Sequence, residues 1–292
     1  MNNREDVQFT SGGVTCRAWF YEGTPGAPVV VLGHGLGGVR TMRLDAFAER
    51  FAAEGYSCLV FDYRHFGDSD GEPRQLLDID RQLQDWAAAI AYARTRGSGR
   101  VVLWGTSFGG GHVIVAAARD GDIAAVVSQC PFTDGLASAL ATNPLVAAKV
   151  TLRALGDRVR GTIGRTPRMI PLAGPPGSTA LMSTPDALDG YLALLPEAGT
   201  FRNEVFARVG LDIPLRRPGR HASKVACPIL FSVCETDSVA PAKATLRHAA
   251  RAPRGEVRLY PEGHFAIYVG EAFERVVADQ IEFLLRCAPV RN

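Results

Sequence analysis

Short apolar runs alternate with amphipathic stretches along most of the chain. Six runs have the length and apolar content of buried strands: residues 29–32, 57–61, 101–104, 123–128, 228–233 and 256–260. Apolar side chains recur at helical spacing in residues 42–54, 78–94, 107–119 and 241–251. This alternation predicts a mostly parallel sheet with helices on both faces.

Two further signals refine the prediction for the N-terminal half. Residues 7–10 and 14–21 flank Ser11-Gly12-Gly13, which predicts a β-hairpin. Asp78 is a predicted N-cap, because its carboxylate can accept from the free N–H groups of the first helical turn.

The alternation stops after the predicted strand at residues 123–128 and resumes at residues 228–233. Residues 136–155 have a helical pattern that Pro144 interrupts, and four prolines in residues 166–177 exclude an ordinary long helix there. We expect further short helices after Ser183-Thr184-Pro185-Asp186, over residues 188–195, and over residues 201–209. The chain is therefore predicted to have a core domain, residues 1–131 and 222–292, and an insertion, residues 132–221.

The predicted strand at 101–104 ends in Gly105-Thr106-Ser107-Phe108-Gly109, and a predicted helix follows. A strand, a sharp G-x-S-x-G turn and a helix are the context of a nucleophile elbow, which predicts Ser107 as a nucleophile. Gly67-Asp68-Ser69-Asp70-Gly71 matches the same pattern, but two aspartates flank its serine and Pro73 follows. Negative charge disfavours an alkoxide, so Ser69 is interpreted as a turn residue.

A serine nucleophile needs a base and an acid that orients the base. Asp237 follows the predicted strand at 228–233, and His264 follows the one at 256–260. Both therefore reach the same sheet edge as Ser107, in the chain order Ser, Asp, His. Backbone N–H groups of Phe108 and of the glycine-rich loop after residues 29–32 are suited to stabilising an oxyanion.

These motifs resemble those of α/β-hydrolase-superfamily serine hydrolases. The resemblance spans residues 14–133 and 222–287 and also rests on His34-Gly35-Leu36-Gly37-Gly38, residues 62–69, residues 237–241 and Gly263-His264-Phe265. It implies the α/β-hydrolase fold, Ser107 as nucleophile, His264 as base, Asp237 as orienting acid, and an oxyanion hole made by Leu36 and Phe108. It further implies that residues 132–221 form a helical lid over an apolar acyl pocket.

Several other residues compete for the catalytic roles. Asp134 also follows a predicted strand and could replace Asp237, and Glu235 is a lesser candidate. His34 is expected to shape the oxyanion turn and His112 to pack on its helix. The remaining histidines, His65, His221 and His248, are expected at the surface.

The function predicted from these residues is hydrolysis of a small-molecule acyl ester through an acyl-enzyme, without a metal or another cofactor. The same machinery serves thioesterases, lactonases, amide hydrolases, C–C hydrolases and acyltransferases, and a non-catalytic ligand-binding homologue shares the scaffold. The insertion could alternatively pack on the core or mediate dimerisation, which leaves a homodimer open.

Composition and charge narrow the range of partners and cellular locations. The chain has 292 residues, 47% of them hydrophobic, and a formal net charge of +2, which gives no electrostatic case for nucleic acid or an anionic membrane as partner. No run of about 18 apolar residues predicts a membrane span. Six widely spaced cysteines without a C-x-x-C pair and a polar N-terminus predict free thiols and a cytoplasmic protein.

Overall fold

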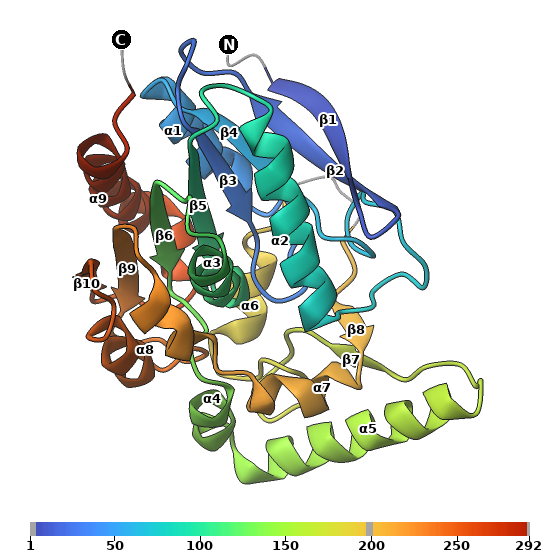
Figure 1. Ribbon diagram of the computed structural model, residues 1–292. Coiled ribbons are helices and arrows are strands. Elements are labelled where there is room, and N and C mark those ends of the chain that lie inside the picture. The colour runs from blue at the N-terminus through green and yellow to red at the C-terminus, as the bar shows by residue number, and fades with distance from the viewer. Residues whose placement is uncertain (1–3, 197–200, 291–292) are drawn as a thin grey trace.

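The computed structural model describes residues 4–196 and 201–290 and centres on one eight-stranded sheet (Figure 1). Its strands are β1 (Arg4–Ser11), β2 (Val14–Tyr21), β3 (Val29–Gly33), β4 (Ser57–Phe61), β5 (Val101–Thr106), β6 (Ala125–Gln129), β9 (Ile229–Cys234) and β10 (Gly255–Tyr260). They lie in the order β1-β2-β4-β3-β5-β6-β9-β10. Only the pairs β1–β2 and β2–β4 are antiparallel, so the sheet is mostly parallel, as predicted.

Helices cover both faces of this sheet (Figure 1). α1 (Leu44–Ala53) and α9 (Gly270–Cys287) lie on one face, and α2 (Ile79–Arg94), α3 (Phe108–Arg119) and α8 (Ala242–Ala249) on the other. Because both faces are covered, β3, β4, β5 and β6 are buried along their whole length. The central strands therefore hold their connecting loops on a rigid support.

The elements of the core agree with the sequence prediction. The hairpin pairs β1 with β2 in register from Arg4 and Tyr21 to Ser11 and Val14. Asp78 caps α2 by accepting from the N–H groups of Asp80 and Arg81. All six cysteines are free thiols. No described helix is long and apolar enough to cross a bilayer.

The insertion lies between β6 and β9, and most of its regular elements are helices. It contains α4 (Gly135–Ala141), α5 (Pro144–Thr162), β7 (Met169–Pro171), α6 (Ala187–Leu192), β8 (Glu204–Phe206), α7 (Val209–Asp212) and two short 3₁₀ helices, Ile213–Leu215 and Pro218–Lys224. The predicted interruption at Pro144 is confirmed, since Pro144 is the first residue of α5. Proline is tolerated there because its missing N–H would have no helical partner.

The helix predicted over residues 201–209 is wrong. Residues 204–206 form β8, which pairs antiparallel with β7 and brings the buried side chains of Ile170 and Val205 together. Gln75, on the loop before α2, adds bonds from its amide group to the carbonyls of Arg202 and Glu204. These partners are distant in sequence, so local spacing could not reveal the strand.

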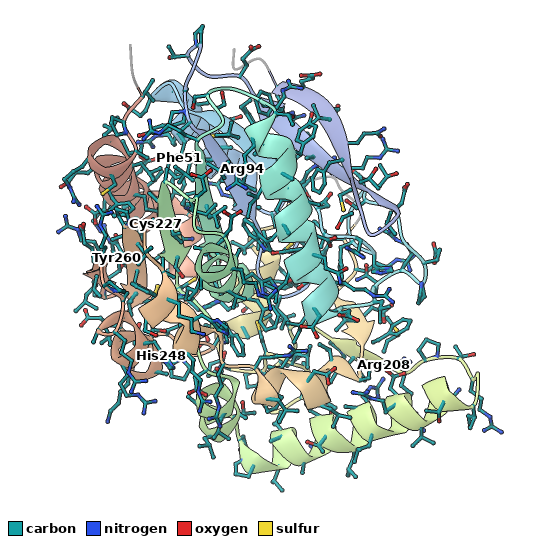
Figure 2. The ribbon with its side chains drawn as sticks, in the orientation of Figure 1. Phe51, Arg94, Arg208, Cys227, His248 and Tyr260 are labelled. Carbon is teal, nitrogen blue, oxygen red and sulfur yellow. The ribbon has the colours of Figure 1, made fainter. Side chains whose placement is uncertain are left out.

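One buried carboxylate fixes the long helix α5 to the rest of the insertion. Asp157 is fully buried and accepts from the N–H groups of Arg168 and Arg208 at 2.8 and 3.0 Å. The Arg208 guanidinium, labelled in Figure 2, donates to the same carboxylate at 2.7 Å. Because a buried charge without partners would be costly, this cluster holds α5 in one position.

Candidate active site

Ser107 occupies a strained turn between β5 and α3. Its φ of 55° and ψ of −117° lie outside the regions that residues with a side chain usually adopt. Such strain persists where the surrounding structure fixes the backbone, and it is common at reactive residues. The turn projects the serine at the carboxyl end of the central strand, as the motif predicts.

Two glycines allow the loop after β3 to touch this turn. A Cβ atom on Gly109 would lie 2.4 Å from the carbonyl oxygen of His34, and one on Gly35 would lie 2.8 Å from Cβ of Ser107. Side chains at these positions would push the two segments apart. The close approach places Leu36 and Phe108 beside the serine, where they line the same cavity.

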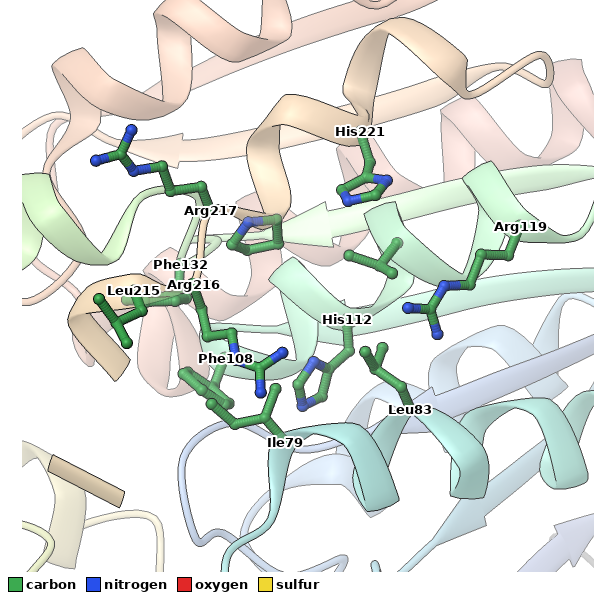
Figure 3. A pocket seen from close by; sticks show the side chains of 12 residues that line it. Ile79, Leu83, Phe108, His112, Arg119, Phe132, Leu215, Arg216, Arg217 and His221 are labelled. Atoms are coloured by element: carbon green, nitrogen blue, oxygen red, sulfur yellow. The ribbon is translucent and has the colours of Figure 1, made fainter. Parts of the chain in front are cut away.

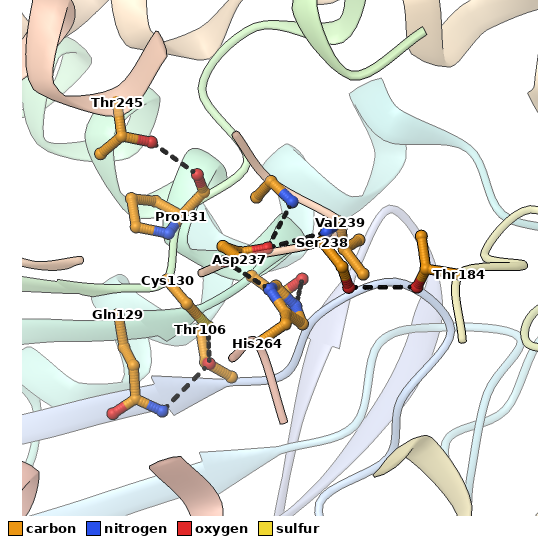
Figure 4. A network of polar contacts seen from close by, with 12 residues as sticks. Thr106, Gln129, Cys130, Pro131, Thr184, Asp237, Ser238, Val239, Thr245 and His264 are labelled. Carbon is orange, nitrogen blue, oxygen red and sulfur yellow. Dashed lines mark hydrogen bonds and ion pairs between the residues drawn. The ribbon is translucent and has the colours of Figure 1, made fainter. Parts of the chain in front are cut away.

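The structure brings Ser107, His264 and Asp237 into one hydrogen-bonded row. Nε2 of His264 lies 3.0 Å from Oγ of Ser107, and Nδ1 lies 2.7 Å from Oδ2 of Asp237. Figure 4 shows His264 and Asp237 among the polar residues around them. An imidazole held by a carboxylate on one nitrogen leaves the other free to accept a proton from a hydroxyl.

The loop after β9 holds the Asp237 side chain in place. Oδ1 accepts from the N–H groups of Val239 and Ala240 at 2.9 and 2.6 Å, which leaves Oδ2 for His264. The side chains of Asp237 and His264 are each only 1% exposed. Water therefore competes little for the bond between them.

The same carboxylate sets the protonation of the imidazole. Burial opposes the charged imidazolium and by itself would lower the pKa of His264. The Asp237 carboxylate and, to a lesser degree, Cys130 outweigh the effect of burial, so the pKa of His264 is raised well above its ordinary value of 6.5. A carboxylate in contact favours the protonated form because opposite charges attract strongly in a water-poor site. His264 can act as a base only in the fraction of molecules where it is neutral.

A tyrosine from the insertion fixes the loop that carries Leu36. The Tyr191 hydroxyl, buried on α6, donates to the carbonyl oxygen of Leu36 at 2.7 Å. The Phe108 N–H lies in the first turn of α3, where no preceding helical carbonyl is available to it. Both N–H groups that the sequence predicts for an oxyanion hole thus belong to backbone positioned beside Ser107.

The rival acids and serine are engaged elsewhere. Asp134 caps α4 by accepting from the N–H groups of Leu136 and Ala137. Oγ of Ser69 donates to the Asp62 carbonyl oxygen at 2.7 Å and accepts from the Arg17 N–H at 2.8 Å. Neither residue has a bond to His264 among the described contacts, and Glu235 is exposed.

The remaining histidines are not placed as bases for Ser107. Burial lowers the pKa of His34 to about 4, and this ring spans the oxyanion loop between the Gly35 N–H and the Met42 carbonyl. His112 packs on α3 and bonds to Gln82 at 2.9 Å. The prediction of surface positions is wrong for His65 and His248, which are buried beneath Gly71 and Gly219. The turn at Gly71 covers His65 and the distant Gly219 covers His248, and local polarity does not reveal either contact.

A cavity of about 440 Å³ opens at Ser107 between the core and the insertion. The insertion supplies most of its lining, including Val146, Val150, Leu181, Met182 and Ile213. Among the described residues, no charged side chain lines it. Its neutral polar groups are hydroxyls and one amide, so the cavity is suited to an uncharged, mainly apolar ligand.

Three arginines of α5, Arg153, Arg158 and Arg160, do not line this cavity. Arg153 donates to the Met169 carbonyl, Arg160 to the Thr166 carbonyl, and Arg158 to the Asp212 carboxylate. Of the three, Arg153 and Arg158 are exposed and Arg160 is partly buried. The cavity beside Ser107 therefore receives no cation from this helix.

A second cavity of about 230 Å³ shares Phe108 and Phe132 with the first (Figure 3). Its described lining includes His112, His221 and the guanidinium groups of Arg119 and Arg216, but no hydroxyl, thiol or carboxylate. Burial lowers the pKa of His112 to about 3. Of these two cavities, only the one at Ser107 has a serine in its described lining.

Comparison with known proteins agrees with this fold. The family model described as serine aminopeptidase, S33, matches residues 24–165, which include Ser107. Quorum-quenching protein AidA of Acinetobacter baumannii (strain MDR-ZJ06) is 58% identical over 291 residues, covering 98% of this chain and 96% of AidA. The chain belongs to the α/β-hydrolase superfamily. The comparisons thus support a hydrolase of this type.

Other relatives of this α/β hydrolase differ in their described activities. Thiohydrolase aneE of Aspergillus aculeatus is 25% identical over 295 residues, covering 96% of this chain and 92% of aneE. The crystal structure of the α/β hydrolase GrgF from Penicillium sp. sh18 matches with a TM-score of 0.81 at 24% identity, over 98% of this chain and 99% of that one. The GrgF match supports the fold.

Sequence reasoning missed two residues that support the site. Tyr191 lies on a predicted helix, but nothing in the pattern indicates that its hydroxyl reaches Leu36. The sequence predicts Asp186 only as part of a helix start. In the structure its carboxylate accepts from the hydroxyl groups of Ser238 at 2.7 Å and Thr184 at 2.9 Å. Figure 4 shows Thr184 meeting Ser238 beside Asp237, so the insertion also braces the acid loop.

Proposed function

We propose that this α/β hydrolase is a serine hydrolase that cleaves carboxylic esters through a covalent acyl-enzyme. The observation that carries the proposal is the row from Ser107 through His264 to Asp237 at the wall of an uncharged cavity. The hydroxyl of a serine is a weak nucleophile, and this arrangement supplies both its base and the base's orienting acid. The insertion, residues 132–221, serves as the lid over the acyl group.

The proposed reaction proceeds in two steps. Oγ of Ser107 attacks the ester carbonyl while Nε2 of His264 takes its proton, and the imidazolium then protonates the leaving alcohol. The N–H groups of Leu36 and Phe108 stabilise the oxyanion, a contribution that is typically about 3–4 kcal/mol per donor. Water, deprotonated by His264, then releases the acid and restores Ser107.

The comparisons make two other acyl substrates worth testing alongside simple esters. AidA is described as quorum-quenching and aneE as a thiohydrolase, which favours a small acyl signalling compound or an acyl thioester. Lactone, thioester and ester carbonyls are attacked by the same nucleophile. The alternatives therefore differ in what the cavity accommodates, while the catalytic residues stay the same.

The test is a panel of esters, lactones and thioesters with matched acyl groups, combined with mass spectrometry of the enzyme during turnover. We expect turnover of at least one class and an acyl adduct on Ser107. Ser107→Ala should abolish both. Ser69→Ala should retain most turnover, although it loses two buried hydrogen bonds and some stability. Equal loss in the two variants, or no turnover of any carbonyl substrate, would contradict the proposal.

A further inference from the structure

The long helix α5 exposes an apolar stripe on the side that faces away from the cavity. Among its 19 residues only Val146, Ala154 and Asp157 are buried. Besides Leu155, which is 47% exposed, four large apolar side chains along it and at its C-cap are widely exposed: Leu145 by 73%, Leu152 by 69%, Val159 by 59% and Ile163 by 59%. At about 100° per residue they fall within about 40° of one another around the helix.

The stripe is straight and lies at an edge of the molecule. From Leu145 to Ile163 it extends for about 27 Å at 1.5 Å per residue. Figure 1 shows α5 along the border of the protein farthest from the sheet, with no element beyond it. A protruding apolar ridge of this length can lie along the surface of a bilayer.

The charges beside the stripe are all positive. Lys149, Arg153 and Arg160 follow one flank within about 40° of one another, and none has a carboxylate at ion-pair distance among the described residues. From residue 144 to residue 165 the chain has five basic residues and one acidic residue, the buried Asp157. The net charge of +2 for the whole chain hides this local excess.

We propose that the outer face of α5 docks on the surface of a bilayer that contains anionic phospholipid. The apolar side chains of the stripe would insert at the boundary between headgroups and acyl chains. The cations along its flank, Lys149, Arg153 and Arg160, would bind lipid phosphates. A second copy of α5 is a poorer occupant, because it would bring more cations and no exposed carboxylate of its own.

Docking would also place the cavity near the lipid. The opposite side of α5 contributes Val146, Ala147, Val150 and Thr151 to the cavity lining, so one helix, about 10 Å in diameter, separates the acyl site from the bilayer. The benefit of placing the acyl site near the bilayer rests on the proposed function, because apolar ester substrates would concentrate in the membrane. The docking itself does not depend on the reaction.

Flotation of the full-length protein with unilamellar vesicles tests the proposal. We expect binding to vesicles of phosphatidylglycerol and phosphatidylcholine, weaker binding to phosphatidylcholine alone, and weakening by salt. The double variant Leu152→Ser/Val159→Ser should lower the partition coefficient at least about tenfold. Lys149→Gln should lower it about fivefold on anionic vesicles only.

The matched control is Leu259→Ser/Leu285→Ser, which removes exposed apolar side chains from β10 and α9 and should bind as wild type does. Turnover of a soluble short ester and the thermal unfolding midpoint should stay unchanged in every variant, because none of these residues lines the cavity. Three results would overturn the proposal: no binding to anionic vesicles, binding that the stripe variant leaves intact, or a dimer that the stripe variant dissociates without any vesicle binding.

Discussion

At the scale of single residues, the site depends on side chains that fix the direction of others. Asp237 uses one carboxylate oxygen for two backbone N–H groups and the other for His264. Tyr191 reaches from the insertion to the Leu36 carbonyl. Neither contact needs to touch the substrate, yet each determines where a reacting atom would meet a donor or a base.

The pH dependence of turnover should report the contact between His264 and Asp237. Because Asp237 raises the pKa of His264 and only neutral His264 accepts a proton, kcat/KM should rise with pH through a pKa above 6.5. Asp237→Asn should lower kcat by about 10⁴-fold and move the acidic limb to lower pH. Asp134→Asn is the control. If Asp237→Asn lowered turnover by the same factor at every pH, without moving the acidic limb, Asp237 would not be the acid that holds His264.

Tyr191→Phe should lower kcat for a short ester by about fivefold, as expected from one hydrogen bond of about 1 kcal/mol. The KM should change little, because Tyr191 does not line the cavity. Tyr56→Phe removes a similar buried bond, from the Tyr56 hydroxyl to the Ala288 carbonyl oxygen, at a site before β4. If both variants lost only stability, Tyr191 would have a structural role alone.

At the scale of elements, the junction of β3, β5 and α3 creates the elbow. Adjacent parallel strands bring the two loops to the same edge of the sheet, and small residues allow them to touch. The sequence predicted this junction well, because strand, glycine-rich turn and helix are consecutive in the chain. It predicted the insertion less well, since β7 and β8 pair across more than thirty residues.

Gly109→Ala should destabilise this junction by at least about 2 kcal/mol, because its Cβ would meet two backbone carbonyls that cannot move independently. Turnover should fall as well, since α3 carries the Phe108 N–H. Thermal unfolding and kcat give the two measurements. Gly121→Ala, where a Cβ would meet nothing within 4 Å, should change neither, and a similar loss there would point to a general effect of the substitution.

At the scale of the whole molecule, the cavity exists because the insertion folds over the core. One side of α5 closes the cavity and the other side is exposed to the exterior. Matched neutral and anionic esters should therefore differ, with kcat/KM higher for the neutral series. Longer acyl chains should gain about fourfold per methylene until the cavity is full.

Val150→Phe should shorten the longest acyl chain that the enzyme accepts. The added ring would occupy the space of about two methylenes and cost about fifteenfold in kcat/KM for long esters, with short esters unaffected. Val159→Phe, on the outer side of the same helix, is the control and should leave the chain-length profile unchanged. A loss that is equal for all chain lengths would argue against an acyl group beside Val150.

The sequence by itself determined the succession of strands and helices along the core of the chain. It also identified Ser107, Asp237 and His264 as candidate catalytic residues. Those features are encoded locally, in spacing, caps and motifs at strand ends. Only the tertiary structure decided that His65 and His248 are buried, that residues 204–206 form a strand, that Tyr191 holds Leu36, and that the apolar side of α5 faces outward. The physical reason is that periodicity shows which side chains share a face, whereas what covers that face depends on segments far away in the chain.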